Sequence, residues 1–596
     1  MKPTDTSNPE YFHKVVDCQY ACPAHTPVPE YIRLIAAERY SDAYMVNWES
    51  NVFPGVLGRT CDRPCEPACR RGRLGGEEEP VAICRLKRVA ADNKGDVSQR
   101  MPAVPEKKNG KRVALIGGGP AALTVARDLA PLGYTLELYD DQIKGGGFMR
   151  SQIPSFRLPE AVLDEEVDQV LNLGVSAHFN HRVESLRAVI DKNYDAVFVG
   201  TGAPQGRDLS LPGREECADN VHIGINWLSS VAFGHIEKIG RKVLVLGGGN
   251  TAMDCCRTAR RLGGEDVKVV VRSPFADMKA SPWEKDDAMA EDIPIFDNHV
   301  PKEFIYRDGR LTGMRFEKVE AVYDASGARS LRPTGEPAVV FECDEVLIAV
   351  GQENAFPWIE RDIGIEFNDW QCPVLDKQTF QSTLPQVFFG GDAAFGPENI
   401  ITAVAQGHQV AISIDKFCRG ENLSDRPPPT TNLVSQKMGI HEWSYDSSVA
   451  HDQRHAVPHA EKQQALQDRQ LEVELGFSEE SGFKEAMRCL NCDVQTVFHE
   501  SRCIECDACV DICPTDCISF VENADEGPLR KTLSAPANNL AQDLYISLDL
   551  PTERVLVKDE NVCLHCGLCA ERCPTTAWDM QKYFYGVSKS CDIKVL

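Results

Sequence analysis

The sequence of 596 residues lacks any long apolar run. No stretch approaches the roughly 18 consecutive apolar residues that a membrane-spanning helix needs, and the residues after Met1 are polar, unlike a signal peptide. Basic residues are also few, since 64 Lys and Arg face 89 Asp and Glu for a formal charge of −25. Because nucleic acids and anionic membranes repel such a charge, we expect neither as a partner.

Cysteine, in contrast, is abundant, with 24 residues. In a short secreted protein they would predict disulfides, but this chain is long and we expect no export signal. Most cysteines stand in CxxC or CxxxC groups towards the two ends of the chain. Disulfides need no such regular spacing, whereas metal clusters do. We therefore predict metal–sulfur centres, in an oxygen-poor cytoplasm.

The strongest motif is a repeated C-x2-C-x2-C-x3-C-P near the end of the sequence. It is the spacing of bacterial ferredoxins with two [4Fe–4S] clusters, in which the fourth cysteine of each motif binds the other cluster. A structural zinc site is the alternative. The predicted ligands of the first cluster are Cys503, Cys506, Cys509 and Cys573, and those of the second are Cys563, Cys566, Cys569 and Cys513. Of the nearby histidines His13, His25 and His565, each is a candidate ligand or an ordinary hydrogen-bonded side chain.

The middle of the chain alternates buried-strand runs with helical stretches, which predicts an α/β fold. The runs are VALIGGG, DAVFVGTG, KVLVLGGG, VKVVVR, EVLIAVG and QVFFGGD. Two of them lead into a Gly-rich turn that opens a helix, where backbone amides and the helix N-terminus can bind a pyrophosphate. The residues of the first turn are Gly117, Gly119, Pro120, Ala121 and Ala122, and those of the second are Gly247, Gly249, Asn250, Thr251 and Ala252.

The residue that ends the next strand distinguishes the two turns. Asp140 follows the first, where a carboxylate can bind a ribose hydroxyl. Arg272 follows the second, where a guanidinium suits a 2′-phosphate and favours NADPH over NADH. The sequence therefore predicts two dinucleotide sites, one of them for NADP or NAD.

Residues 112 to 420 resemble the small subunit of bacterial glutamate synthase and its relatives. The resemblance lies in LIGGGPAAL, GGGFMRSQIPSFRLP, DAVFVGTGA, LVLGGGNTAMD, IAVGQ and FFGGDAAFGPENIITAVAQG. It implies that the first dinucleotide fold holds FAD and that Asp392 binds the ribityl chain. It also implies that the helix from Ile401 points at the isoalloxazine, and that FAD lies near Gly146, Gly147, Gly391 and Ala403.

The N-terminal cysteines are similar to those of the same family, whose helical domain carries two [4Fe–4S] clusters. The family's EAxRCLxC motif stands here as EAMRCLNC near the other end of the chain. We hypothesise that the chain folds back, so that one cluster takes Cys18, Cys69, Cys489 and Cys492. Lys87 stands where relatives have a Gln or Glu ligand, so we nominate Cys84 three residues earlier; the second cluster then takes Cys22, Cys61, Cys65 and Cys84. The alternative is a single N-terminal cluster, with Cys84, Cys489 and Cys492 unused.

Together these features predict two Rossmann-like domains between two iron–sulfur domains. We place a helical iron–sulfur domain at 1–105, an FAD domain at 106–225 and 346–425, an NAD(P) domain at 226–345, a linker with a returning helix at 426–498, and a ferredoxin-like α+β domain at 499–596.

The predicted function is electron transfer between NAD(P)H and one-electron carriers through FAD and about four [4Fe–4S] clusters. One interpretation is a flavin subunit of a hetero-oligomer, such as a 2-oxoacid:acceptor oxidoreductase with an iron–sulfur or TPP-type partner subunit. Others are a glutamate synthase small subunit or a free-standing NAD(P)H:ferredoxin oxidoreductase. An alternative of another class is a structural iron–sulfur scaffold with an inactive flavin site. No acid–base constellation with supporting context occurs, so we predict no catalytic side chain.

Overall fold

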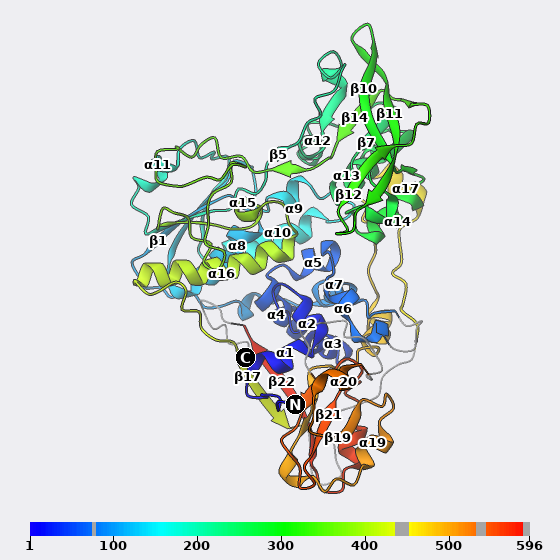
Figure 1. The fold of residues 1–596 in the computed structure, drawn as a ribbon. Coiled ribbons are helices and arrows are strands. Elements are labelled where there is room, and N and C mark those ends of the chain that lie inside the picture. The colour runs from blue at the N-terminus through cyan, green and yellow to red at the C-terminus, as the bar shows by residue number, and fades with distance from the viewer. Residues whose placement is uncertain (74–78, 436–451, 532–543, 588–596) are drawn as a thin grey trace. The chain divides into compact units, whose positions relative to one another are not determined.

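The computed structural model describes residues 1–73, 79–435, 452–531 and 544–587, and the chain divides into two compact units (Figure 1). The α/β unit comprises residues 102–424 and 458–475. The cysteine-rich unit comprises residues 1–101, 425–457 and 476–596. Among the described residues, no helix combines the length and hydropathy that crossing a bilayer requires.

The first sheet of the α/β unit is parallel, with strand order β16-β4-β1-β2-β3. Its inner strands β1 and β4 are almost wholly buried because helices cover a parallel sheet on both faces. Gly407 of α16 allows a close approach to α8, since a Cβ there would lie 2.7 Å from Thr124 Cβ. The elements are β1 (Arg112–Ile116), α8 (Pro120–Leu129), β2 (Thr135–Tyr139), α9 (Phe148–Ser151), α10 (Glu160–Leu171), β3 (Ser176–His178), α11 (Leu186–Ile190), β4 (Ala196–Val199), β16 (Val387–Phe389), α15 (Asp392–Phe395) and α16 (Ile400–Arg419).

A second parallel sheet has the order β6-β14-β7-β8-β9. Beside it in the chain, four antiparallel strands, β10 to β13, form a separate sheet, and the short strands β5 and β15 pair with each other. The elements are β5 (Gln205–Gly206), β6 (Val221–Ile223), α12 (Gly224–Ala232), β7 (Lys242–Leu246), α13 (Asn250–Arg261), β8 (Asp266–Val270), α14 (Pro282–Ala290), β9 (Ile295–Phe296), β10 (His299–Arg307), β11 (Arg310–Tyr323), β12 (Arg329–Pro333), β13 (Val339–Glu342), β14 (Glu345–Ile348) and β15 (Gln352–Glu353).

The second sheet corrects the predicted boundaries of the NAD(P) domain. The expected range 226–345 omits β6 entirely and cuts through β14, yet β14 pairs with both β6 and β7. All six predicted buried-strand runs are strands, as β1, β4, β7, β8, β14 and β16. The antiparallel strands β10 to β13 carry no long apolar run, because much of their surface is exposed, and the sequence did not predict them.

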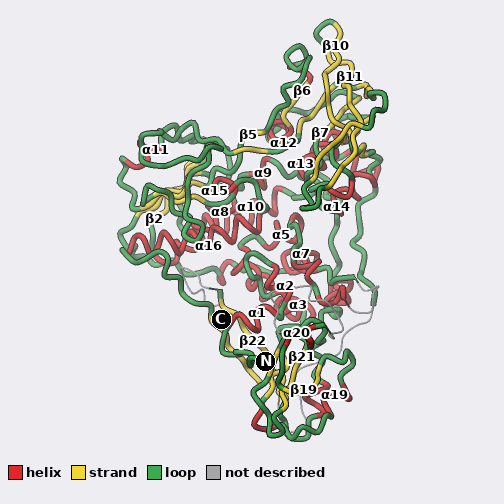
Figure 2. Tube along the Cα trace, viewed as in Figure 1, coloured by secondary structure: helices red, strands yellow, loops and turns green. Residues whose placement is uncertain are grey.

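Among the described residues up to Met101, the regular elements of the cysteine-rich unit are all helices (Figure 2). Residues 37–39 separate helix α3 from helix α4. Helix α18, from the other end of the sequence, packs against α3 and α7. It ends at Ala486, so the CxxC of Cys489 and Cys492 lies beyond the helix. The helices are α1 (Pro9–Lys14), α2 (Asp17–Ala21), α3 (Val28–Ala36), α4 (Tyr40–Asn51), α5 (Pro54–Thr60), α6 (Cys65–Ala68), α7 (Ile83–Asn93) and α18 (Glu479–Ala486).

Two small antiparallel sheets, β17-β22-β18 and β19-β21-β20, form the rest of this unit. β17 comes from the segment predicted as a linker and pairs with β22 over six residues, Thr430 to Ser435. The elements are β17 (Thr430–Ser435), β18 (Val494–Phe498), α19 (Ala508–Ile512), β19 (Ile518–Glu522), α20 (Glu526–Arg530), β20 (Tyr545–Ile546), β21 (Arg554–Lys558), α21 (Leu568–Arg572) and β22 (Trp578–Gly586).

The same predicted linker also contains α17 (Lys462–Gln467), which belongs to the α/β unit. Ala465 of α17 and Val473 pack on Phe156 in one small buried cluster. The Val473 amide donates to the Phe156 carbonyl at 2.9 Å. Residues 458–475 are therefore a packed strap on the α/β unit. Short 3₁₀ turns complete the fold at η1 (Arg70–Arg73), η2 (Ser98–Arg100), η3 (Ala130–Leu132), η4 (Ala218–Asn220), η5 (Phe275–Asp277) and η6 (Glu500–Arg502).

Candidate iron–sulfur and dinucleotide sites

Four cysteines from the two ends of the chain line one cavity in the cysteine-rich unit. We call them the split set: Cys18, Cys69, Cys489 and Cys492. Burial, above all, raises the pKa of the Cys489 thiol to about 12, and the charge of Cys69 adds to the effect. Arg70 and Arg71 also line this cavity and bring positive charge to it. Four thiols around one buried space, next to cations, are a donor set that fits an iron–sulfur cluster.

A second group of four thiols comes together near Lys87 of α7. We call it the helical set: Cys22, Cys61, Cys65 and Cys84. The Cys84 thiol hydrogen-bonds with those of Cys61 and Cys65. The ammonium of Lys87 is buried beside this set; burial alone would lower its pKa, but the charges of the four thiols raise it. Lys87 is thus a cation at this set.

The ferredoxin-like motifs form the last two groups. The first ferredoxin set is Cys503, Cys506, Cys509 and Cys573, and the second ferredoxin set is Cys513, Cys563, Cys566 and Cys569. After burial and the charge of Glu505, the charges of Cys573 and Cys506 raise the pKa of Cys503. The second ferredoxin set lines a cavity together with Lys558. The motif spacing thus brings together the thiols that it predicts.

Cys517, which belongs to none of the predicted ligand sets, lines the same cavity as the second ferredoxin set. Its Sγ is 3.4 Å from Cys513 Sγ, and this hydrogen bond, as the largest cause, lowers the pKa of Cys513 to about 5. Cys591 lies outside the described residues.

Each of the four sets shares a backbone feature that the spacing did not reveal. Two residues after one cysteine of the set stands a non-glycine residue in the left-handed region: Arg63, Asn491, Glu505 and His565, with φ of 55°, 50°, 53° and 55°. This conformation directs the backbone amide of the left-handed residue towards the Sγ of the cysteine two residues earlier. The amide-to-Sγ distances are 3.4 Å for Arg63 to Cys61, 3.3 Å for Glu505 to Cys503 and 3.5 Å for His565 to Cys563. The Asn491 amide likewise lowers the pKa of Cys489 against burial. N–H···S bonds stabilise thiolates and set cluster potentials, so they support the fit.

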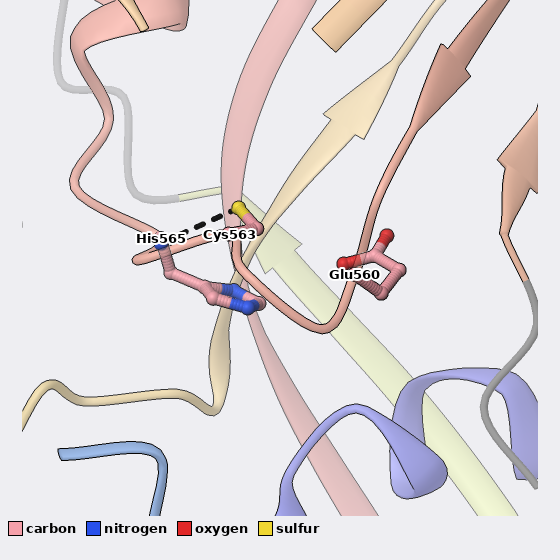
Figure 3. Close-up of side chains that lie close together, drawn as sticks. All are labelled: Glu560, Cys563 and His565. Carbon is pink, nitrogen blue, oxygen red and sulfur yellow. Dashed lines mark hydrogen bonds between the residues drawn. The ribbon is translucent and has the colours of Figure 1, made fainter. Parts of the chain in front are cut away.

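His565, Cys563 and Glu560 lie together, as Figure 3 shows, and their donor atoms are close enough to share an ion. Both ring nitrogens of His565 are already engaged, Nδ1 with the Val494 carbonyl at 3.2 Å and Nε2 with Arg70 at 2.6 Å. Burial is the main reason why its pKa is well below the usual value. His565 is therefore a neutral, hydrogen-bonded side chain. His13 and His25 likewise bond each other, at 3.1 Å.

The predicted FAD residues converge at the carboxyl ends of the first parallel sheet. Gly117 follows β1 with φ of +98°, and a Cβ there would lie 2.5 Å from the Gly200 carbonyl oxygen. A Cβ on Gly147 would lie 2.8 Å from Gly119 Cα. On the other side of the turn, a Cβ on Gly391 would lie 3.2 Å from Ala121 Cβ and 3.8 Å from Ala403 Cβ.

Polar groups at the same place fit a dinucleotide. Asp140 accepts hydrogen bonds from the Gly118 amide and, at 2.8 Å, from the Gln142 amide, so it also braces the Gly-rich turn. Burial raises the pKa of Asp392, at the start of α15, to about 6. Thr201 Oγ1 and Gln406 Oε1 are buried without a hydrogen-bond partner among the described residues. A carboxylate and buried polar atoms without a described partner, close to the Gly-rich turn, suit the hydroxyl and amide groups of FAD.

The second Gly-rich turn is built alike. A Cβ on Gly247 would lie 2.1 Å from the Ala349 carbonyl oxygen, so only glycine fits there. Gly249 caps α13, and Asn250 Oδ1 accepts a hydrogen bond from the Ser281 amide at 2.8 Å. Arg272 follows β8 and is exposed. The helix N-terminus of α13 and the exposed guanidinium suit the phosphates of a nicotinamide dinucleotide.

These two turns on parallel sheets, with thiol sets at both ends of the chain, define an FAD-dependent NAD(P)H oxidoreductase that transfers electrons through iron–sulfur centres. Three family descriptions match the chain: pyridine nucleotide-disulphide oxidoreductase at residues 111–407, dihydropyrimidine dehydrogenase domain II with a 4Fe-4S cluster at 13–98, and 4Fe-4S dicluster domain at 502–577.

Curated relatives agree with this class. The NADP(+)-dependent formate dehydrogenase subunit beta of Moorella thermoacetica is 32% identical over 80% of this chain and 70% of its own length. The NADPH-Fe(3+) oxidoreductase subunit beta of Geobacter sulfurreducens is 29% identical over 82% of this chain and 77% of its own length. The glutamate synthase [NADPH] small chain of Mycobacterium tuberculosis is 29% identical over 70% and 88%, respectively. The chain belongs to this family of FAD- and NAD(P)-dependent iron–sulfur oxidoreductases, which confirms the resemblance drawn from its motifs.

Proposed function

We propose that this chain is the NADPH-linked electron-transfer subunit of a larger enzyme complex and that it holds four [4Fe–4S] clusters. One observation carries the proposal: sixteen predicted ligand thiols are brought into four groups of four within the cysteine-rich unit. The split set supports four clusters over three, because Cys489 and Cys492 reach Cys18 and Cys69 despite lying at the opposite end of the sequence.

FAD, when bound, exchanges a hydride with the nicotinamide and single electrons with iron–sulfur centres. In this proposal the chain positions it through the turn Gly117–Ala122, with Gly146, Gly147 and Gly391 allowing close approach and Asp392 accepting from the ribityl hydroxyls. No described side chain is needed as an acid or base, which agrees with the lack of a catalytic constellation in the sequence.

For the nicotinamide dinucleotide we propose NADPH, held by the turn at Gly247 and the N-terminus of α13. The exposed guanidinium of Arg272 would pair with the 2′-phosphate. The three relatives above, whose names specify NADP(+) or NADPH, support this choice.

The partner we propose is an enzyme subunit with its own redox centre, in a cytoplasmic hetero-oligomer. Two of the relatives above are named as beta subunits, of a formate dehydrogenase and of an iron(III) oxidoreductase. A 2-oxoacid:acceptor oxidoreductase subunit with a TPP site is one such partner. Free ferredoxin is the alternative electron carrier.

Anaerobic affinity purification from the native source tests the proposal. We expect co-purifying redox subunits, one FAD and about 16 irons per chain, and bleaching of the flavin band with NADPH. A chain isolated alone would contradict the subunit role. About eight irons per chain would contradict four clusters, and no bleaching with either NADPH or NADH would contradict the oxidoreductase.

A further inference from the structure

The side chain of Arg70 is one of the most deeply buried cations in the cysteine-rich unit, with 1% of it exposed. It follows Cys69 of the split set directly in sequence. Its Nη1 donates to the Cys563 carbonyl and to His565 Nε2, both at 2.6 Å. Its Nη2 donates to the Val15 carbonyl and the Asp17 carboxylate, both at 3.0 Å. One guanidinium therefore ties the N-terminal helices to the loop of the second ferredoxin set.

Arg70 is close to thiols of both sets. It lines the cavity of the split set. Burial alone would lower its pKa, but the charges of Asp17, Cys492 and Cys563 outweigh it and raise the pKa. Cys492 belongs to the split set and Cys563 to the second ferredoxin set, so a single positive charge acts on one thiol of each.

We propose that Arg70 is a positioning residue shared by two cluster sites, the split set and the second ferredoxin set, which makes these two sites direct neighbours. The inference rests on the ligand assignment proposed above. Its consequence is an order within the unit: the second ferredoxin set lies next to the split set, and the first ferredoxin set, whose Cys506 is exposed, is left as the site that can meet a partner.

Arginine suits this role better than lysine. Its planar group offers five donors in a fixed fork, and here four acceptors on two segments far apart in sequence, residues 15–17 and 563–565, use them. A lysine would keep the charge but could not hold Val15, Asp17 and the Cys563 loop together.

The test uses the full chain with its clusters reconstituted, and compares Arg70→Met and Arg70→Lys with Lys558→Met. Lys558 is a matched control because it is also a buried cation, but it lines the cavity of the second ferredoxin set only. Redox titration followed by EPR gives one midpoint potential for each cluster.

Removing a positive charge disfavours the reduced, more negative cluster, so the potential of each cluster near it falls. In Arg70→Met we expect two potentials to fall together, and in Lys558→Met only one. Arg70→Lys keeps the charge, and it replaces Arg70→Met in the test if that variant does not fold. It should change the EPR line shapes of the same two clusters, with smaller shifts in their midpoint potentials.

Failure of this inference can be told apart from failure of the proposed function. A wild-type chain with about 16 irons whose Arg70 variants alter one cluster or none would overturn the role of Arg70 alone. A wild-type chain with about eight irons would overturn both, since the split set would then be empty.

Discussion

Single residues show most clearly what the spacing of cysteines can and cannot predict. The motif predicted which thiols meet, and Cys84 was found because Lys87, three residues on, cannot bind iron. The left-handed residues Arg63, Asn491, Glu505 and His565 were not predicted, because a positive φ is uncommon for any non-glycine residue, even for Asn and His, in which it is enriched. The role of Arg70 was not predicted for another reason: its hydrogen-bond partners Cys563 and His565 are almost 500 residues away in sequence.

Asp392 gives a prediction about pH at this scale. Burial raises its pKa from 3.8 to about 6, so between these values the folded chain without FAD binds a proton that the unfolded chain does not. Its contribution to stability is thus complete below about pH 3.8 and is lost as the pH rises through 6. Asp392→Asn should therefore raise the unfolding free energy of the FAD-free protein at pH 7.5 by up to about 3 kcal/mol, with less effect near pH 5, while weakening FAD binding.

Chemical denaturation at the two pH values and flavin titration check this prediction. Asp369→Asn is the control, since that carboxylate is exposed in the same region of the chain. The gain in unfolding free energy of Asp392→Asn over wild type should be larger at pH 7.5 than at pH 5. An equal gain at both pH values would show that burial of Asp392 carries no such cost.

At the scale of elements, the strands and the Gly-rich turns could be predicted, whereas the strap at residues 458–475 could not. β1, β4 and β7 contain short apolar runs that lead into glycine-containing turns, which favours buried strands. The strap is polar, and within α17 only Ala465 is buried. A single small apolar residue gives no periodicity, so the packing on Phe156 is visible only in three dimensions.

The strap leads to a second prediction. Ala465→Asp places an unpaired carboxylate against Phe156 and should destabilise the attachment of the strap by about 2–4 kcal/mol. Hydrogen exchange measured by mass spectrometry should then show faster exchange at residues 458–475. Gln463→Asp, which adds the same charge on the exposed side of α17, should leave the exchange unchanged. Equal exchange in both variants would mean that the strap is not held by Ala465.

At the scale of the whole molecule, the two units depend on different kinds of stabilisation. In the α/β unit, strands β1 and β4 of the first sheet are buried, and two apolar clusters include the strands of the second parallel sheet. The cysteine-rich unit buries thiols of all four sets. Once these thiols ionise to thiolates, their negative charges repel one another unless a metal binds them.

Removing iron should therefore affect one unit selectively. Treatment with ferricyanide and a chelator should abolish the cooperative unfolding transition of the cysteine-rich unit, with exchange accelerating in residues 1–101 and 476–587. The α/β unit should retain FAD and should still reduce a dye with NADPH. Loss of FAD together with iron, or an unchanged exchange pattern, would contradict separate stabilisation. The reciprocal control releases FAD while the iron stays bound.

The distance in sequence between the halves of the split set has a consequence for synthesis. Cys18 and Cys69 leave the ribosome early, but Cys489 and Cys492 follow only after the whole flavoprotein part has been translated. A prematurely terminated chain can thus fold its dinucleotide sheets, yet it lacks half of the thiols around this cavity. Only a polypeptide translated beyond Cys492 can therefore assemble the complete split set.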